Sequence, residues 1–391
     1  MAPPRPGTAL LGLLSGDAGE ATRLDAEGWN RLARMAADHR LEPILSSLVR
    51  RADMGGVVPP PLQERWRAAF RAAAIQALVQ RRTLLCLSAQ LARDGLPHVA
   101  LKGAWLADHA YRHPAQRPLR DLDLLLPSGA LLPAWHLLRA QGWTGPHLCP
   151  AELAAFAQQE RHLPALVSAE GVVVELHSAL HDIADPRIDT APLASRMLAD
   201  AHIVADERVP YPRPADLLAH LCIHAVYSHR LNVGPLLLSD IDHLLQARPV
   251  DWSIFWRDAQ ASGYTRGAAL CLALVERWLR PGVLRAAQCP LAVADAQVTE
   301  ASELLVQPAG ARKDIVLQGA LRHGWRQGGG RAVLAMLGDK ARHDRRDLAQ
   351  RPPSLAERVT RAGQAARAAL ASDTRQFARR TADLDAFLVE G

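Results

Sequence analysis

Apolar residues in the first quarter of the chain recur at helical spacing. One helix face is formed by Trp29, Leu32, Ala33 and Ala36. A leucine stripe continues between residues 78 and 91, after a stretch at 53–61 that is rich in Gly and Pro and separates the helices. The pattern predicts a small helical region over residues 1–93.

The pattern changes at residues 94–97, where the sequence Asp-Gly-Leu-Pro indicates a turn. The segments that follow are shorter. Strands are expected at 98–101, 119–126, 163–168 and 172–178, with helices at 104–112 and 131–141. The three residues between the last two strands include Gly171, which indicates a β-hairpin. These features predict a compact α/β unit over residues 94–190.

Helical spacing returns after about residue 192. The clearest segments are 214–226, 236–245, 254–262 and 268–279. This third region is expected to extend over residues 191–391. The fold class that follows is α+β, with a small sheet-containing core flanked by N-terminal and C-terminal helical regions.

Positive charge dominates the chain, which has a formal net charge of +6 and a pI near 9.4. Between residues 311 and 380, sixteen Lys or Arg stand against six Asp or Glu. This excess favours contact with anions such as nucleotides, and the alternative is a solvated Arg-rich surface. A nucleic-acid partner is not expected, because no nucleic-acid motif accompanies the charge and acidic neighbours interrupt the arginines.

Nothing in the sequence indicates a membrane partner. No run of about 18 apolar residues is present, so no membrane span is expected. The five cysteines form no C-x-x-C pair, a pattern typical of reduced, mostly buried thiols. We therefore expect a cytoplasmic protein.

Two carboxylates stand in the predicted strand 119–126. Alternate side chains of a strand share a face, so Asp121 and Asp123 should point the same way. Like charges side by side on a half-buried sheet repel each other, and a divalent cation removes that cost. Hard oxygen ligands are what Mg²⁺ prefers. The alternative is a pair of solvent-exposed strand residues without a metal.

A third carboxylate interrupts the apolar strand at 172–178. Glu175 shares a face there with Val173 and His177. If this strand lies beside the strand of Asp121, three carboxylates converge in a geometry that suits two-metal phosphoryl chemistry. The alternative is a salt bridge from Glu175 to Arg117 or Arg120.

A Lys-Gly pair precedes these aspartates by about twenty residues, at a predicted strand-to-helix junction. Gly103 permits close approach of backbone to a ligand, and Lys102 adds a point charge for phosphate. Arg117 and Arg120 lie just before the aspartates and are expected to clamp the same triphosphate.

Residues 101–126, LKGAWLADHAYRHPAQRPLRDLDLLL, resemble the signature of the uncharacterised nucleotidyltransferase family of the polymerase-β-like superfamily. Residues 172–180, VVVELHSAL, resemble its third-carboxylate strand. The resemblance covers about residues 95–180 and extends loosely to His220, His224 and Asp240. It implies a small mixed-sheet nucleotidyltransferase core.

By this resemblance, Asp121, Asp123 and Glu175 would be catalytic and would bind Mg²⁺, with Mn²⁺ as the alternative. Glu175 would also help to activate the acceptor hydroxyl. The implied nucleotide-binding residues are Lys102, Gly103, Arg117, Arg120 and His177. A structural hydrogen bond is the other reading of His177. The chain departs from the superfamily at Ala104, where Ser or a second Gly is commoner, and in having Glu rather than Asp as third carboxylate.

The expected activity is transfer of a nucleoside monophosphate from an NTP, with ATP as the default, to a hydroxyl on a small molecule, peptide or protein. A biosynthetic or tailoring role would fit, because relatives of the family it resembles are encoded near biosynthetic genes. The departures at Ala104 and Glu175 motivate the alternative of a catalytically impaired nucleotide-binding module with the same fold.

Two further pairs of residues have open roles. His220 and His224 share a helix face, where they could bind a metal, pack in the core or contact a base. Asp240 and Asp242 lie in a predicted helix, where caps or salt-bridge partners are expected.

Overall fold

The computed structural model describes residues 5–51, 54–182, 185–204, 207–307 and 372–389. The chain divides into two compact units, residues 1–306 and 307–391. The described helix of the second unit is α18 (Ser372–Val389), and most of the expected Arg-rich tail lies outside the described residues. The division at residues 93 and 190 stays a prediction.

Helices open the first unit, as the apolar spacing predicts. They are α1 (Pro6–Ser15), η1 (Ala21–Arg23), α2 (Ala26–Asp38), α3 (Glu42–Arg51), η2 (Met54–Gly56) and α4 (Pro60–Arg93). The Asp25 carboxylate caps α2 by accepting the backbone N–H of Gly28 at 2.7 Å. The predicted apolar face of α2 is buried, but the leucine stripe of α4 is buried only from Leu84 onwards, and Leu78 is 71% exposed.

A four-stranded mixed sheet forms the centre of the unit, as the α+β prediction requires. Its strands are β1 (Val99–Ala100), β2 (Leu122–Leu125), β3 (Leu166–Val167) and β4 (Val173–His177), in the order β1-β2-β4-β3. β2 and β4 are parallel, and the outer strands are antiparallel to their neighbours. The expected hairpin joins β3 to β4, and Gly171 adopts the positive φ that its turn requires.

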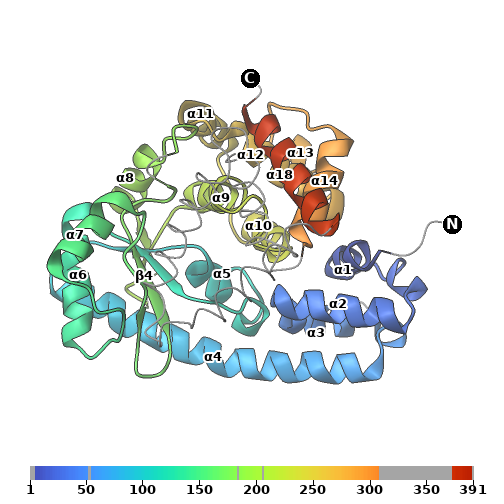
Figure 1. The fold of residues 1–391 in the computed structure, drawn as a ribbon, viewed down its shortest axis with the longest axis horizontal. Coiled ribbons are helices and arrows are strands. Elements are labelled where there is room, and N and C mark those ends of the chain that lie inside the picture. Colours follow the sequence, from blue (N-terminus) through green and yellow to red (C-terminus); the bar gives the residue numbers. More distant parts are fainter. Residues whose placement is uncertain (1–4, 52–53, 183–184, 205–206, 308–371, 390–391) are drawn as a thin grey trace, which may run out of the picture. The chain divides into compact units, whose positions relative to one another are not determined.

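Helices cover this sheet at positions set by the connections between strands. They are α5 (Gly103–His109), η3 (Pro114–Gln116), α6 (Ser128–Ala140) and α7 (Pro150–Gln159), of which the sequence patterns did not predict α7. α5 packs against β2 and α6 against β4, while α4 runs past η3 to α3 (Figure 1). Leu122, Leu124, Val174 and Leu176 are all at most 1% exposed, so one sheet face is core.

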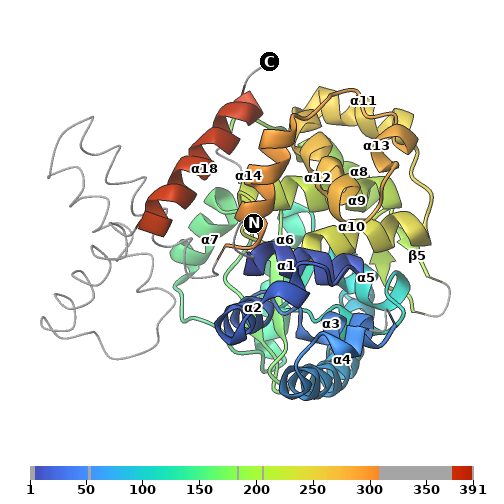
Figure 2. The same cartoon turned by 90° about the vertical axis from the view of Figure 1, so that its right-hand side faces the viewer.

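The chain after β4 is helical apart from one short ribbon. Its elements are α8 (Ala191–Ala199), β5 (His202–Ile203), β6 (Pro210–Tyr211), α9 (Pro214–Ile223), the π-helical turn η4 (His224–Ser228), α10 (Leu236–Ala247), α11 (Trp252–Ser262), α12 (Thr265–Trp278), α13 (Val283–Ala286) and α14 (Asp295–Leu305). Helices α9, α10 and α12 pack together, with α1 beside α12 (Figure 2). The four predicted helices are present here, with boundaries shifted by a few residues.

The cysteines differ in part from expectation. All five are free thiols, but only Cys222 and Cys271 are buried, so the prediction of mostly buried thiols is wrong. Among the described helices, none combines the length and the apolar character needed to cross a bilayer.

Candidate active site

Two parallel strands bring carboxylates together on one face of the sheet. In the register of β2 and β4, Asp123 lies opposite Glu175 and Leu125 lies opposite His177. Asp121 immediately precedes β2 and, two residues before Asp123, belongs to the same face. The pairing of the two strands on which the predicted convergence depends is therefore present, and the leucines between the carboxylates point into the core.

Asp123 is held by two cationic groups. The Lys102 Nζ lies 3.0 Å from its Oδ2 atom, and the His177 Nε2 donates to its Oδ1 atom at 2.7 Å. The same His177 nitrogen lies 3.4 Å from Oε2 of Glu175. Because Asp123 is only 5% exposed, these contacts form in a place from which water is largely excluded, where charge-assisted hydrogen bonds are strong.

The surroundings push the acidities of the two aspartates apart. Burial and the nearby charges of Asp123 and Glu175 raise the pKa of Asp121 to about 6. For Asp123, Lys102 and His177 outweigh the effect of burial and hold the pKa of its carboxyl well below the usual range. Two carboxyl groups on one short segment thus differ strongly in proton affinity.

Burial and hydrogen bonding also have opposite effects on the pKa values of Glu175 and His177. Burial acts against the charge of both Glu175 and His177, but their mutual hydrogen bond and the bond from His177 to Asp123 outweigh it. The pKa of Glu175 is lowered and that of His177 is raised. The buried cluster therefore favours two carboxylates together with an imidazolium and an ammonium group.

Among the described residues, one group of three potential metal ligands lies close enough to share an ion. One ligand atom each from Asp123, Glu175 and His177 lies within 4.8 Å of the others. Carboxylate oxygens suit Mg²⁺ and Mn²⁺, and a further carboxylate, that of Asp121, lies beside them. This donor set fits a divalent ion, although the cation now beside Asp123 is the Lys102 ammonium.

The Lys-Gly bend is strained and tightly packed. Lys102 has φ of 48° and precedes the first residue of α5. A Cβ atom on Gly103 would lie 2.4 Å from Cδ2 of Leu119 and 2.9 Å from Nη1 of Arg117. A side chain here would force the ends of the Leu119 and Arg117 side chains to move, because α5 packs directly on the segment that leads into β2.

Arg117 and Arg120 occupy different surroundings. The guanidinium of Arg117 donates to Asp240 twice, at 3.0 Å and 2.7 Å, and Tyr111 donates to the same carboxylate at 2.7 Å. Arg120 is exposed. Asp240 forms a salt bridge with Arg117, and Asp242 forms one with Arg280 at 2.7 Å. The expected role of salt-bridge partner is therefore confirmed for both aspartates.

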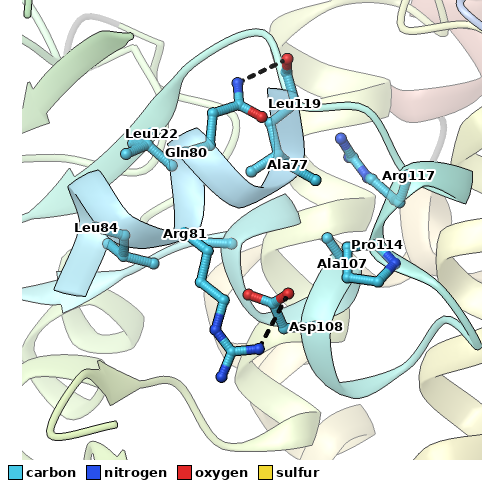
Figure 3. Close-up of a pocket in the computed structure, with 11 residues that line it drawn as sticks. Ala77, Gln80, Arg81, Leu84, Ala107, Asp108, Pro114, Arg117, Leu119 and Leu122 are labelled. Atoms are coloured by element: carbon cyan, nitrogen blue, oxygen red, sulfur yellow. Dashed lines mark hydrogen bonds and ion pairs between the residues drawn. The ribbon is translucent and has the colours of Figure 1, made fainter. Parts of the chain in front are cut away.

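Helix α4 fixes the loop that joins α5 to β2. Gln80 donates to the carbonyl oxygen of Leu119 at 3.2 Å, and Arg81 lies 3.8 Å from the Asp108 carboxylate (Figure 3). The cavity between these residues, which Arg117 also lines, holds about 10 Å³, enough for one water molecule. The contacts set the position of the backbone just before Asp121.

Two residues near the carboxylates were not anticipated. Arg40 follows α2 with φ of 57°, and its pKa is lowered by burial and by Arg120, while Asp121 acts in the opposite direction. His162 forms a bridge with His177 and lies 4.0 Å from Glu175. No local signal marks Arg40, whereas His162 directly precedes a predicted strand.

His220 of α9 is buried, and His224 at the start of η4 is partly buried. His220 and His224 have ring centroids 6.0 Å apart, and no group of three potential metal ligands in the described part of the chain includes either of them. Burial, followed by the charge of Lys102, holds the pKa of both well below the usual range. Both rings are therefore neutral and lie within electrostatic reach of Lys102.

Asp121→Asn should stabilise the metal-free protein by about 1–2 kcal/mol at pH 7.5. Because the pKa of Asp121 is about 6 in the folded protein, folding holds a proton on this carboxyl that the unfolded chain releases near pH 4. The resulting loss of folding stability develops between pH 4 and 6 and is complete above pH 6. Thermal denaturation in EDTA at pH 7.5 and pH 4 would measure the effect, with Glu170→Gln in the hairpin loop as control. A variant less stable than the wild type at pH 7.5 would contradict it.

Residues 25–280 match the model of a protein family described as uncharacterised nucleotidyltransferase. The match extends well beyond the resemblance at residues 95–180. It begins at the cap of α2 and ends just after α12, so the matched region includes helices that precede the sheet in the sequence and helices that follow it. Among curated proteins, none matches the chain.

Proposed function

Because the chain belongs to the uncharacterised nucleotidyltransferase family and is thus a transferase, we propose that it moves a nucleoside monophosphate from an NTP to a hydroxyl group. The observation that supports this most directly is the register that sets Asp123 beside Glu175 on parallel strands, with Asp121 on the same face. A small molecule, a peptide or a protein would supply the hydroxyl, and ATP is the default donor.

In this proposal Asp121, Asp123 and Glu175 hold the divalent ion, Mg²⁺ or Mn²⁺. When bound, the ion would neutralise the triphosphate and the developing negative charge of the reaction. Lys102 is bonded to Asp123 in this structure. We propose that it releases Asp123 and turns to the phosphates when the site is loaded, which the flexible lysine stem allows.

The transfer itself needs one bond formed and one broken. The acceptor oxygen attacks the α-phosphorus, the bond from that phosphorus to the bridging oxygen of the β-phosphate breaks, and pyrophosphate leaves. The hydroxyl proton passes to Glu175, whose carboxylate lies beside Asp123 and also completes the metal site.

The basic residues around the site have different proposed tasks. Arg120 and Arg40 attract the triphosphate. The charge of Arg40 interacts with those of Arg120 and Asp121, so both arginines lie near the carboxylates. His177 orients Asp123 and Glu175 through its hydrogen bonds. Arg117 is occupied by Asp240 and supports the Lys-Gly bend, so we propose that it positions the site rather than binding nucleotide directly.

The proposal is tested by thermal shift with ATP, GTP, CTP and UTP, each with Mg²⁺ and with EDTA, followed by mass spectrometry of candidate acceptors. We expect one NTP to raise the melting temperature in Mg²⁺ but not in EDTA, and to release pyrophosphate. Nucleotide binding with no pyrophosphate release and no transferred mass would instead favour the impaired binding module.

A further inference from the structure

A basic cavity lies away from the carboxylates, where α3 and α4 meet the loop around η3. Its volume is about 320 Å³. The residues that line it include Arg50 and Arg51 at the end of α3, Phe70 of α4, and Arg112 and His113 ahead of η3. The cavity is large enough for a small ligand, since ligand pockets begin at about 300 Å³.

All charged residues among the described ones that line this cavity are basic. The structure gives none of its three arginines an ion pair with a described carboxylate. Arg50 donates to the carbonyl of Ser46 at 3.4 Å, and its guanidinium lies 6.0 Å from the centre of the Phe70 ring. All three arginines are exposed, so their guanidinium donors can reach a ligand in the cavity, and a bound anion would supply the acceptors that no described carboxylate provides.

The cavity also offers oriented polar and aromatic groups. The Nδ1 atom of His113 accepts the backbone N–H of Ala115 at 3.1 Å, so a neutral ring carries its proton on Nε2 and can donate. The same ring lies 5.0 Å from that of Phe70. Ser47 and Gln116 are both only 5% exposed and add polar groups deeper in the wall.

We infer that this cavity binds a small phosphorylated molecule, through Arg50, Arg51 and Arg112. Arginine is suited to phosphate because its planar donors form paired hydrogen bonds. A small ligand fits better than a polymer, because the volume is limited to about 320 Å³ and the buried Ser47 and Gln116 lie in the wall of the cavity. Its lining segment, Arg112 to Gln116, leads directly into Arg117, which packs against Gly103 at the Lys-Gly bend.

Isothermal titration of the full chain with inorganic pyrophosphate in EDTA tests the inference without involving a metal at the carboxylates. We expect saturable binding that Arg50→Gln and Arg112→Gln each weaken at least tenfold. The matched control is Arg82→Gln, an exposed arginine of α4 that does not line the cavity. Arg120→Gln, at the exposed arginine proposed to attract the triphosphate, should leave this binding unchanged, which separates the cavity from the proposed transfer site.

Three results would overturn the inference. The first is no saturable binding to the wild type. The second is a loss in Arg82→Gln as large as that in Arg50→Gln, which would indicate general surface charge. The third is tighter binding of a single-stranded oligonucleotide with the same dependence on Arg50 and Arg112, which would assign the surface to a nucleic acid. Circular dichroism of each variant confirms that it is folded.

Discussion

Replacing both Asp121 and Asp123 with Asn should lower Mg²⁺-dependent pyrophosphate release by about 10³-fold or more. The change removes two of the three carboxylates proposed to hold the ion while keeping the size of both side chains. It also leaves Lys102 and His177 without the charge that they contact at 3.0 Å and 2.7 Å. Coupled detection of pyrophosphate at saturating NTP would measure the loss.

The double variant should still fold, because its two effects on stability oppose each other. Asp121→Asn relieves repulsion, whereas Asp123→Asn leaves a buried ammonium and imidazolium unpaired. Glu175→Gln provides a second test, since its side chain is 24% exposed and less critical to the core. Glu170→Gln, in the exposed hairpin loop, should keep full activity. Unchanged release in the folded double variant would remove the metal-site assignment.

The sequence predicted those features of the site that depend on local periodicity. Asp121, Asp123 and Glu175 share a face because a strand repeats every two residues, and that period is visible in a few letters. That β2 and β4 lie side by side was an assumption at the level of the sequence, and the structure shows that the two strands are paired. The strands themselves are shorter than predicted, because pairing ends before the apolar run does.

Features that depend on distant contacts escaped prediction. Arg117 was expected to clamp the triphosphate, with a salt bridge to Glu175 as the alternative. In the structure it pairs with Asp240, which is 123 residues away in the sequence. Arg40 reaches the site from the N-terminal helices, where nothing in its neighbourhood indicates a function. Similarly, Leu78 fits an apolar stripe, yet the helix that carries it extends past the core that would have buried it.

The same distant contact leads to the second large effect. Arg117→Met should destabilise the protein by about 3–5 kcal/mol, because it leaves Asp240 as a buried carboxylate without its cation. Asp240 is 3% exposed, and its remaining bond from Tyr111 cannot offset the lost charge. Urea unfolding followed by intrinsic fluorescence would measure the change. Arg82→Met, on the exposed surface of α4, should alter stability by no more than about 0.5 kcal/mol.

A double variant separates the ion pair from other roles of Arg117. Arg117→Met combined with Asp240→Leu replaces the pair with apolar groups and should recover most of the stability, since no buried charge is left unpaired. If Arg117 instead bound the triphosphate directly, Arg117→Met would keep wild-type stability and raise the KM for the NTP. That outcome would return Arg117 to the nucleotide-binding set, because its contact with Asp240 would then contribute little to the fold.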